Sequence, residues 1–356
     1  MWNSNQLTDQ LKIKYPIIQA GMAGGITTPE LVAAVSNAGG LGNVGAGYMR
    51  AEDMRHTIRA IHKLTTQPFG VNVFNPEYPE TKQDYIDQTN DLLSPIRKEL
   101  GVAPVSISED TPSTLFAEQI DVLLEENVPV ISFTFGIPSK EMIQKLKTAN
   151  KILIGTATTV EEAIMNEASG MDMVVVQGSE AGGHRGTFNG SFEKAMIGTV
   201  ALVPQVVDQV NIPVIAAGGI MDGRGVLASL ILGAQGVQMG TAFVTSVESG
   251  AKKQHKEAIL NSAEDGPVMT SAFSGKPARG VENKFITSMK QHEQQLPDYP
   301  LQNTMTNAIR KEAAKQNKPE YMSLWSGQNT RLSQSKSADQ IISGIVSQIR
   351  NISQGF

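Results

Sequence analysis

Short apolar runs alternate with longer amphipathic segments along most of the chain. Eight of these runs are rich in branched side chains and lack a regular apolar–polar alternation, which is typical of strands buried on both faces of a parallel sheet. We predict these strands at Tyr15–Gln19, Leu41–Val44, Phe69–Phe74, Pro129–Phe133, Ile152–Gly155, Met173–Gln177, Pro213–Ala217 and Gly236–Met239.

The segments between these runs repeat their apolar positions with the period of a helix that buries one face. Helices are predicted at Pro29–Ala38, Ala51–Leu64, Pro112–Glu126, Lys140–Ala149, Val160–Ser169, Ile197–Gln209 and Gly223–Leu232. Because strand and helix alternate in series, the pattern favours an α/β fold of the (β/α)8 type, a TIM barrel, over a doubly wound open sheet.

The chain has 356 residues, more than the roughly 250 that such a barrel takes. The surplus falls in two segments, residues 75–111 after the third predicted strand and residues 248–328 after the eighth. Both leave the carboxyl ends of strands, where barrel active sites form. We therefore expect one domain whose helical insertions form a lid or a small substrate subdomain over that face.

The last predicted element is a helix over Ser337–Ile352. Its isoleucines at positions 341, 345, 349 and 352 recur with helical spacing and form an apolar stripe. We expect this stripe to pack on the outside of the barrel.

Charge and composition narrow the classes of function. The net charge is −5 and the Lys and Arg residues are scattered, which argues against a nucleic-acid surface. The absence of Cys excludes disulfides, thiolate metal sites and Cys nucleophiles, and no metal site is predicted. No apolar run approaches the ~20 residues of a membrane helix, and the polar segment Met1–Lys14 has no signal-peptide core. A cytoplasmic protein, monomer or homodimer, is expected.

Two consecutive predicted strands end in glycine. Gly218 and Gly219 follow Pro213–Ala217, and Gly240 and Thr241 follow Gly236–Met239. The loops after the last two strands of a barrel commonly bind phosphate, because glycine lets backbone N–H groups approach the anion. The alternative is that these glycines only make tight turns. We favour a phosphate site.

A second glycine motif does not support nucleotide binding. Residues 40–45 read Gly-Leu-Gly-Asn-Val-Gly and match the GxGxxG pattern of dinucleotide-binding folds. That pattern requires a strand before it and a helix that opens directly on it. Here a predicted helix precedes the motif and a predicted strand lies inside it, so we reject a Rossmann site.

Amide side chains accompany the predicted strand ends. Gln19 ends the first strand, Asn72 lies within the third, and Gln177 ends the sixth. Buried amides need partners, and Asn72 and Gln177 could offer a donor and an acceptor to the edge of a heterocycle. Each could instead tie down a neighbouring loop. Together with a phosphate site they indicate a planar, phosphate-bearing cofactor, which flavin mononucleotide (FMN) fits.

The glycine-rich segment after the sixth strand, Gln177–Gly186, carries one imidazole, His184. A side-chain-poor and flexible loop of this kind could present a proton-transfer group to a flat ligand. A histidine that merely bonds a backbone carbonyl is the alternative. We expect the other histidines to be structural: His56, His62, His255 and His292.

Several of these motifs together resemble the nitronate monooxygenases, formerly called 2-nitropropane dioxygenases, over nearly the whole length of the chain. The most specific is Ala181-Gly182-Gly183-His184-Arg185-Gly186. The supporting segments are Pro16–Met22, Gly70–Asn72, Ala217–Ile220, Gln238–Thr241, Pro277–Asn283 and Leu324–Gln328. Ser326 stands where the family resemblance leads us to expect alanine. The resemblance therefore does not determine the detailed shape of the pocket.

The resemblance implies an FMN-bearing barrel that oxidises alkyl nitronates with molecular oxygen, releasing nitrite and a carbonyl compound. Propionate 3-nitronate is the substrate usually associated with the family. The resemblance makes His184 the catalytic histidine. Together with the phosphate argument, it gives as cofactor-binding residues Asn72, Gln177, Gly182, Gly218, Gly219, Gln238, Met239, Gly240 and Thr241.

His184 could act in two ways. An unperturbed imidazole has a pKa of about 6.5 and can take the acidic C–H proton of a neutral nitroalkane near neutral pH. A preformed nitronate needs no base, and a protonated His184 could hold that anion instead. Only the first role requires a neutral ring.

Other activities on the same scaffold stay open. An FMN-dependent enoyl-acyl-carrier-protein reductase also has a Gly-Gly-His loop after the sixth strand, but it requires NAD(P)H. An NADH:quinone reductase and a flavin-binding regulator without turnover are further alternatives. The Ala278-Arg279-Gly280 and Trp325 segments favour the nitronate enzymes.

Overall fold

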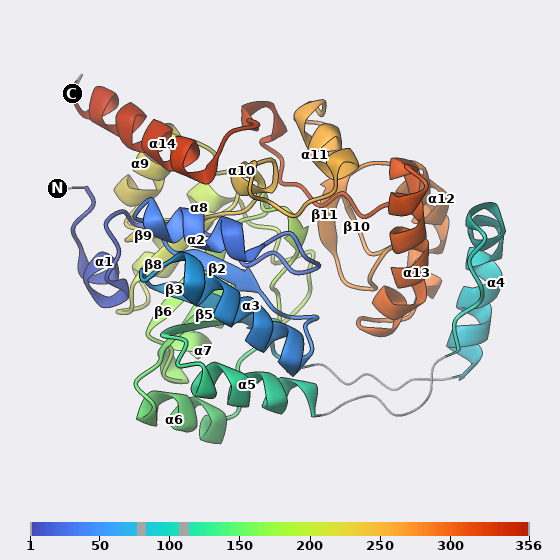
Figure 1. The fold of residues 1–356 in the computed structure, drawn as a ribbon, viewed down its shortest axis with the longest axis horizontal. Coiled ribbons are helices and arrows are strands. Elements are labelled where there is room, and N and C mark those ends of the chain that lie inside the picture. Colours follow the sequence, from blue (N-terminus) through green and yellow to red (C-terminus); the bar gives the residue numbers. More distant parts are fainter. Residues whose placement is uncertain (1, 77–82, 107–113, 355–356) are drawn as a thin grey trace.

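The computed structural model describes residues 2–76, 83–106 and 114–354. In this part of the chain, eight parallel strands form a barrel surrounded by helices (Figure 1). The predicted TIM barrel is confirmed. The barrel strands are β1 (Ile17–Gln19), β2 (Gly42–Gly45), β3 (Phe69–Phe74), β4 (Val130–Thr134), β5 (Ile152–Ala157), β6 (Met173–Gln177), β8 (Val214–Ala217) and β9 (Gly236–Met239).

The strands follow the order β1-β9-β8-β6-β5-β4-β3-β2, and the two ends of this series meet. Ile18 of β1 pairs in parallel with Leu41, just before β2, and the N–H of Gln19 donates to the Leu41 carbonyl at 2.9 Å. The Gln19 amide is fully buried and spans the same seam, because its Oε1 accepts from the N–H of Asn43 at 3.1 Å. Gln19 therefore closes the barrel.

The predicted outer helices are all present, with ends shifted by a few residues, and Pro112 lies outside the described residues. Their starts follow the capping pattern of short polar side chains: Thr28 accepts from the N–H of Leu31, and Ser139 accepts from the N–H of Met142. These helices are α2 (Pro29–Asn37), α3 (Ala51–Leu64), α5 (Leu115–Glu125), α6 (Lys140–Thr148), α7 (Val160–Ala168), α8 (Thr199–Val207) and α9 (Gly223–Ile231).

A helix that the sequence reasoning missed, α1 (Gln6–Leu11), seals the amino-terminal end of the barrel. Its Leu7 and Leu11 are buried in one cluster with side chains from the strands, among them Ile18 and Val175. Burial of such side chains stabilises the fold by about 1.5–3 kcal/mol each. Because this end is filled, the barrel opens only toward the carboxyl ends of its strands.

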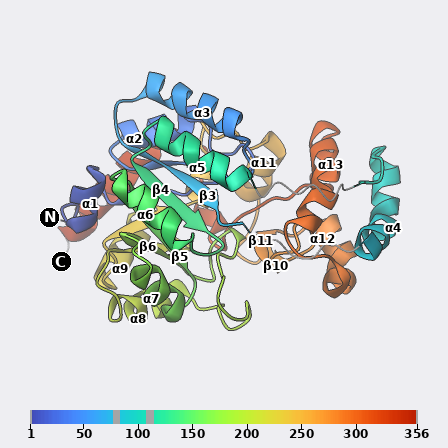
Figure 2. The same ribbon diagram turned by 90° about the horizontal axis from the view of Figure 1, so that it is seen from below.

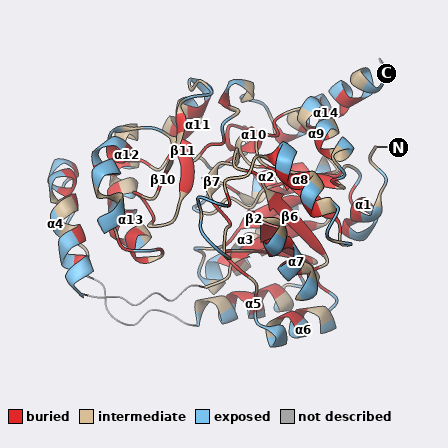
Figure 3. Cartoon of the chain, turned by 180° about the vertical axis from the view of Figure 1, so that it is seen from behind, coloured by how far each residue is buried: buried red, intermediate tan, exposed pale blue. Residues whose placement is uncertain are grey.

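The last helix, α14 (Ala338–Ser353), packs against α9 and α2, as predicted (Figure 1). Ser337 and Gln340 form a capping box at its start. The buried stripe differs from the predicted one: Ile345 and Ile349 are buried, but Ile341 and the residue at 352 are only partly covered, and Ile342 and Val346 are buried in their place. Figure 3 shows this buried stripe along the helix.

The two predicted insertions pack on each other beside the barrel (Figures 1 and 2). Ile86 and Leu93, from the first insertion, share a hydrophobic cluster with Phe273, Phe285 and Met305 from the second. The sequence analysis predicted helical insertions. The structure differs, because a β-hairpin lies among the helices. The elements of the two insertions are α4 (Gln83–Leu100), α11 (Lys253–Leu260), β10 (Pro267–Thr270), β11 (Ala278–Val281), α12 (Lys284–Met289) and α13 (Leu301–Lys315). The short helix α10 (Thr241–Val244) lies between β9 and the second insertion.

The segment after β6 is not a free loop. Gly183 and His184 form a short strand, β7 (Gly183–His184), which pairs antiparallel with Arg279 and Ala278 of β11. A three-stranded sheet, β10-β11-β7, therefore connects the barrel to the second insertion. Within the segment expected to be a flexible loop, Gly183 and His184 therefore have a fixed register.

Among the described helices, none combines the length and the apolar composition needed to cross a lipid bilayer.

Candidate active site

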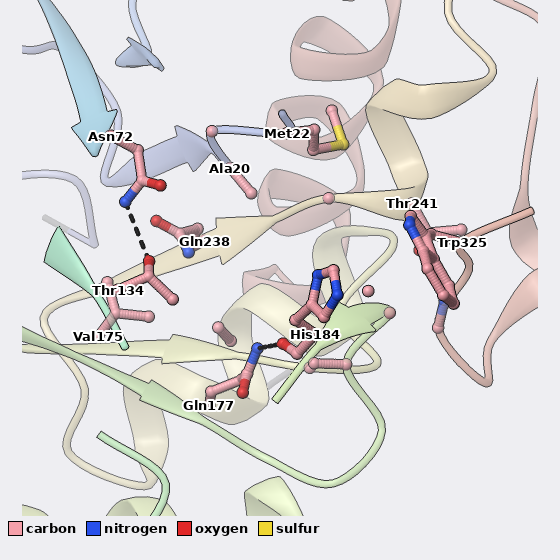
Figure 4. Close-up of a pocket in the computed structure, with 18 of the residues that line it drawn as sticks. Ala20, Met22, Asn72, Thr134, Val175, Gln177, His184, Gln238, Thr241 and Trp325 are labelled. Carbon is pink, nitrogen blue, oxygen red and sulfur yellow. Dashed lines mark hydrogen bonds between the residues drawn. The ribbon is translucent and has the colours of Figure 1, made fainter. Parts of the chain in front are cut away.

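A pocket opens at the carboxyl ends of the barrel strands and extends to Trp325 of the second insertion (Figure 4). It holds about 1340 Å³ of empty space, its open mouth included. The structure brings together most of the residues predicted from the sequence. The predicted residues that line the pocket are Asn72, Gln177, Gly182, His184, Gly218, Gly219, Gln238, Gly240 and Thr241.

Met239 does not join them. Successive side chains of a strand point to opposite faces of the sheet, so Gln238 and Met239 diverge. Gln238 reaches the pocket, whereas Met239 is 1% exposed and packs in the core between the sheet and the outer helices, near Val237 and Phe243. The Met239 side chain therefore does not face the pocket, and a cofactor contact of this residue stays a prediction that would involve its backbone.

The turn after β8 has the geometry of an anion site. Gly218 and Gly219 adopt φ angles of +118° and +69°, which side-chain-bearing residues rarely adopt. The backbone N–H groups of Gly219 and Ile220 donate to no acceptor in the described part of the chain. Two adjacent unpaired donors in a glycine turn are suited to bind a phosphate group.

The amino terminus of α9, by contrast, is already occupied. Asp222 caps it, accepting from the N–H of Arg224 at 3.0 Å and of Gly225 at 3.4 Å. A carboxylate at this position satisfies the helix dipole and would repel a phosphate. An anion would therefore lie at the Gly218–Ile220 turn and at the start of α10, not on α9.

Two amide side chains present free polar atoms to the pocket. The Nδ2 of Asn72 donates to the hydroxyls of Ser132 at 3.0 Å and Thr134 at 3.1 Å, which leaves its Oδ1 as an acceptor. Gln238 projects from β9 into the pocket, and its amide has no partner in the described residues (Figure 4). Because unpaired polar groups are costly to bury, this pair is suited to a ligand with both donors and acceptors.

Gln177 behaves differently. Its Nε2 donates to the His184 carbonyl at 3.0 Å, and its Oε1 accepts from the N–H of Gly186 at 2.8 Å (Figure 4). The amide thus ties down the segment that follows β6, which is the second role considered from the sequence. It still lines the pocket, but most of its hydrogen-bonding capacity is used.

His184 lies between aromatic side chains at the pocket mouth. Its ring centroid is 5.4 Å from that of Trp325, 5.8 Å from Phe135 and 6.1 Å from Tyr299. Its Nε2 lies 2.8 Å from the Ser274 hydroxyl. The ring is therefore largely surrounded by apolar surface and held at one nitrogen.

This environment keeps the imidazole neutral. Burial, together with the positive charges of Arg310 and Lys276, lowers the pKa of His184 to about 3. A ring with such a pKa is unprotonated at neutral pH. Of the two roles considered for His184, the cationic anion anchor requires a protonated ring and the base requires a neutral one, so the lowered pKa is compatible only with the second.

Two arginines that the sequence analysis did not single out hold the segment between β6 and β7. Arg185 is 1% exposed and donates to the carbonyls of Gln177 at 2.9 Å and Ala195 at 3.1 Å. Arg279 donates to the Ser179 carbonyl at 2.9 Å. Burial lowers the pKa of Arg185 to about 10, so it remains charged. The sequence did offer one indication of a role for Arg185, because a charged residue inside a glycine-rich segment is unusual.

Glu180 braces the same segment against α8. Its carboxylate accepts from the N–H of Thr199 at 2.9 and 3.0 Å and from its hydroxyl at 2.8 Å. A Cβ added to Gly219 would lie 3.3 Å from the Glu180 Cβ. Glu180 therefore fixes the start of α8 and packs against the anion turn.

Gly182 is required by protein packing. A Cβ at Gly182 would lie 2.4 Å from the Gly327 nitrogen and 2.5 Å from the Ser326 carbonyl carbon. The N–H of Gly327 in turn donates to the Thr241 hydroxyl at 2.9 Å. The segment around Gly327 therefore joins two predicted site residues.

Neighbouring residues support this segment. Ser326, at the position where alanine was expected, is 1% exposed, and its hydroxyl donates to the Gly327 carbonyl at 3.2 Å. Its side chain does not line the pocket. His255 is buried and its Nε2 bonds the Trp325 carbonyl at 2.8 Å, a structural contact.

The donor set suits an organic cofactor. Within the described residues, no cluster of His, Asp and Glu side chains could hold a metal ion. The glycine turn supplies donors for a phosphate, and Asn72 and Gln238 supply an acceptor and a free amide for a ring edge. These features fit a phosphate-bearing flavin.

Comparisons with known proteins agree with this chemistry. A family model described as nitronate monooxygenase matches residues 4–348. A probable nitronate monooxygenase of Staphylococcus haemolyticus (strain JCSC1435) is 52% identical over 356 residues, covering 99% of both chains.

Among solved structures, a nitroalkane oxidase from Streptomyces ansochromogenes superposes with a TM-score of 0.91 at 38% identity over 99% of both chains. FabK from Thermotoga maritima matches with a TM-score of 0.78 at 33% identity over 99% of this chain and 98% of its own. A flavin is typical of the matched family. This chain belongs to the nitronate monooxygenase family of oxidoreductases.

Proposed function

We propose that this enzyme binds FMN and uses molecular oxygen to convert alkyl nitronates, such as propionate 3-nitronate, into nitrite and a carbonyl compound. One observation carries the proposal: a single pocket contains a glycine turn with unpaired N–H groups and a neutral, aromatic-enclosed His184. The first suits the cofactor phosphate, and the second suits a carbon acid.

The residues that would hold FMN form two groups. Gly218, Gly219, Gly240 and Thr241 would surround the phosphate, and Asn72, Gln177, Gly182 and Gln238 would border the ring system. FMN, when bound, supplies the redox chemistry, while the protein supplies position and electrostatics.

His184 would serve neutral nitroalkanes. Its unprotonated nitrogen accepts the proton from the carbon next to the nitro group, and the C–H electron pair becomes the C=N bond of the nitronate. A nitronate supplied as such bypasses this step. The rings of Phe135, Tyr299 and Trp325 give the imidazole a largely apolar environment, which favours its neutral form.

The test is direct. The purified yellow protein is mixed with propionate 3-nitronate in air, and nitrite is assayed; an anaerobic sample is mixed with the same compound while flavin absorbance is followed. We expect nitrite in air and bleaching without any pyridine nucleotide. Bleaching that occurs only with NADH or NADPH would instead identify a reductase on this scaffold.

A further inference from the structure

Ser274 is a polar side chain that contacts the His184 ring. It lies between β10 and β11, in the second insertion, and is 1% exposed. Its Oγ is 2.8 Å from His184 Nε2, within hydrogen-bonding distance. The side chain is therefore buried against the candidate base.

The protons at this contact can be assigned. A hydroxyl has one hydrogen to donate, and that of Ser274 goes to the Lys276 carbonyl at 3.0 Å. The same oxygen accepts from the N–H of Lys276 at 3.4 Å. With its hydrogen directed to the Lys276 carbonyl, Ser274 is left to accept from His184, and this is the arrangement that we infer. Nε2 then carries the ring proton and Nδ1 carries the lone pair.

The segment that carries Ser274 is rigidly held. Gln302 of α13 donates to the Ala272 carbonyl at 2.7 Å, and the Thr306 hydroxyl donates to the Phe273 carbonyl at 2.5 Å. The N–H of Ser274 donates to the Ser271 carbonyl at 3.2 Å. On the other side of the contact, the pairing of β7 with β11 fixes the backbone of His184. Both partners thus belong to one fixed framework.

We propose that Ser274 is a positioning residue for proton transfer, which holds the Nε2–H of His184 so that Nδ1 is the basic atom. This inference rests on the proposed function. In the step, Nδ1 takes the proton from the nitroalkane carbon, the C–H electron pair forms the C=N bond, and the products are a nitronate anion and an imidazolium.

Ser274 also matters after the transfer. The imidazolium keeps its Nε2–H bond to Ser274, which becomes a stronger, charge-assisted bond backed by the Lys276 carbonyl. The charged groups that act on the ring are Lys276, from the same segment, and Arg310, from α13, and both oppose the new positive charge. Among the described residues no carboxylate contributes to the shift of the His184 pKa. Ser274 is therefore the acceptor that stabilises the cation.

The kinetic test compares two substrates that differ by one proton. In the holoenzyme, Ser274→Ala should lower kcat/KM for nitroethane roughly ten- to hundredfold, which corresponds to the loss of a hydrogen bond to a charged group. The value of kcat/KM for ethyl nitronate should stay within about twofold of wild type. Ser274→Thr keeps the hydroxyl and should restore most of the nitroethane activity. Ser271→Ala, the same change in the same segment without contact to His184, should alter neither substrate.

An equal loss on both substrates, or a Thr variant as impaired as the Ala variant, would overturn the positioning role. Failure of the proposed function looks different: wild-type enzyme would then release no nitrite from ethyl nitronate, whatever occupies position 274.

The tautomer is measured independently of turnover. Long-range 1H–15N NMR of ring-labelled holoenzyme distinguishes protonated from unprotonated ring nitrogens, and His184→Gln identifies the signal. We expect Nε2 protonated and Nδ1 bare in wild type and in Ser271→Ala, and a changed pattern in Ser274→Ala. A wild-type spectrum with the proton on Nδ1, or no change in Ser274→Ala, would contradict the assignment.

Discussion

The pH dependence of nitroalkane oxidation tests the environment of His184 most directly. The perturbation is acid, applied between pH 8 and pH 5 to the wild-type enzyme. An imidazole with the ordinary pKa of about 6.5 is only about 3% unprotonated at pH 5, so kcat/KM would fall roughly thirtyfold. With its pKa lowered to about 3, His184 stays almost fully unprotonated at pH 5. The structure therefore predicts a nearly flat profile.

The assay is nitrite release from nitroethane, with kcat/KM referred to the neutral form of the substrate, since kcat/KM reports the ionisation of the free enzyme. Circular dichroism at each pH confirms that the protein remains folded. Lys276→Met removes the smallest of the three causes of the shift and keeps burial, the largest, so its profile should also stay flat. An acid limb with a midpoint near 6.5 would refute the buried, neutral imidazole.

Three further substitutions have distinct expected results. His184→Asn should retain flavin. Its activity on neutral nitroalkanes should fall at least about a hundredfold more than its activity on nitronates. An equal loss on both substrates would contradict the role of His184 as a base. Gly219→Asp should expel FMN by placing a carboxylate at the anion turn, whereas Gly219→Asn, equally strained at φ +69°, should stay yellow; flavin absorbance after gel filtration decides. Gly182→Ala places a Cβ 2.4 Å from the Gly327 nitrogen and should lower the free energy of unfolding by about 1–3 kcal/mol, as measured by urea denaturation; an unchanged midpoint would mean that the 326–327 segment gives way freely.

The barrel could be predicted from the sequence because each of its units is local. A buried parallel strand such as Met173–Gln177 is a continuous apolar run, and its helix follows within a few residues, so the period of the pattern is enough. The anion turn and the amides at strand ends followed from the same logic, since barrel topology gathers the carboxyl ends of the strands at one face.

What escaped prediction depends on contacts between distant segments. β7 is two residues long and exists because β11, nearly a hundred residues later, pairs with it. No local propensity marks Gly183–His184 as a strand. Ser274 likewise meets His184 only in the folded chain. The burial of the Met239 side chain has a simpler reason: neighbouring side chains of a strand point to opposite faces, so Gln238 faces the pocket and Met239 does not.

The pairing of β7 with β11 defines which parts of the chain can be exchanged between relatives. His184 follows a barrel strand in sequence, yet its backbone partner and its ring partner both come from the second insertion. A chimera that grafts a foreign insertion onto this barrel would lose the partners of His184 while keeping His184 itself. Residues 178–186 and 267–281 therefore depend on each other structurally. A chimera designed to change substrate preference has to take both segments from the same parent.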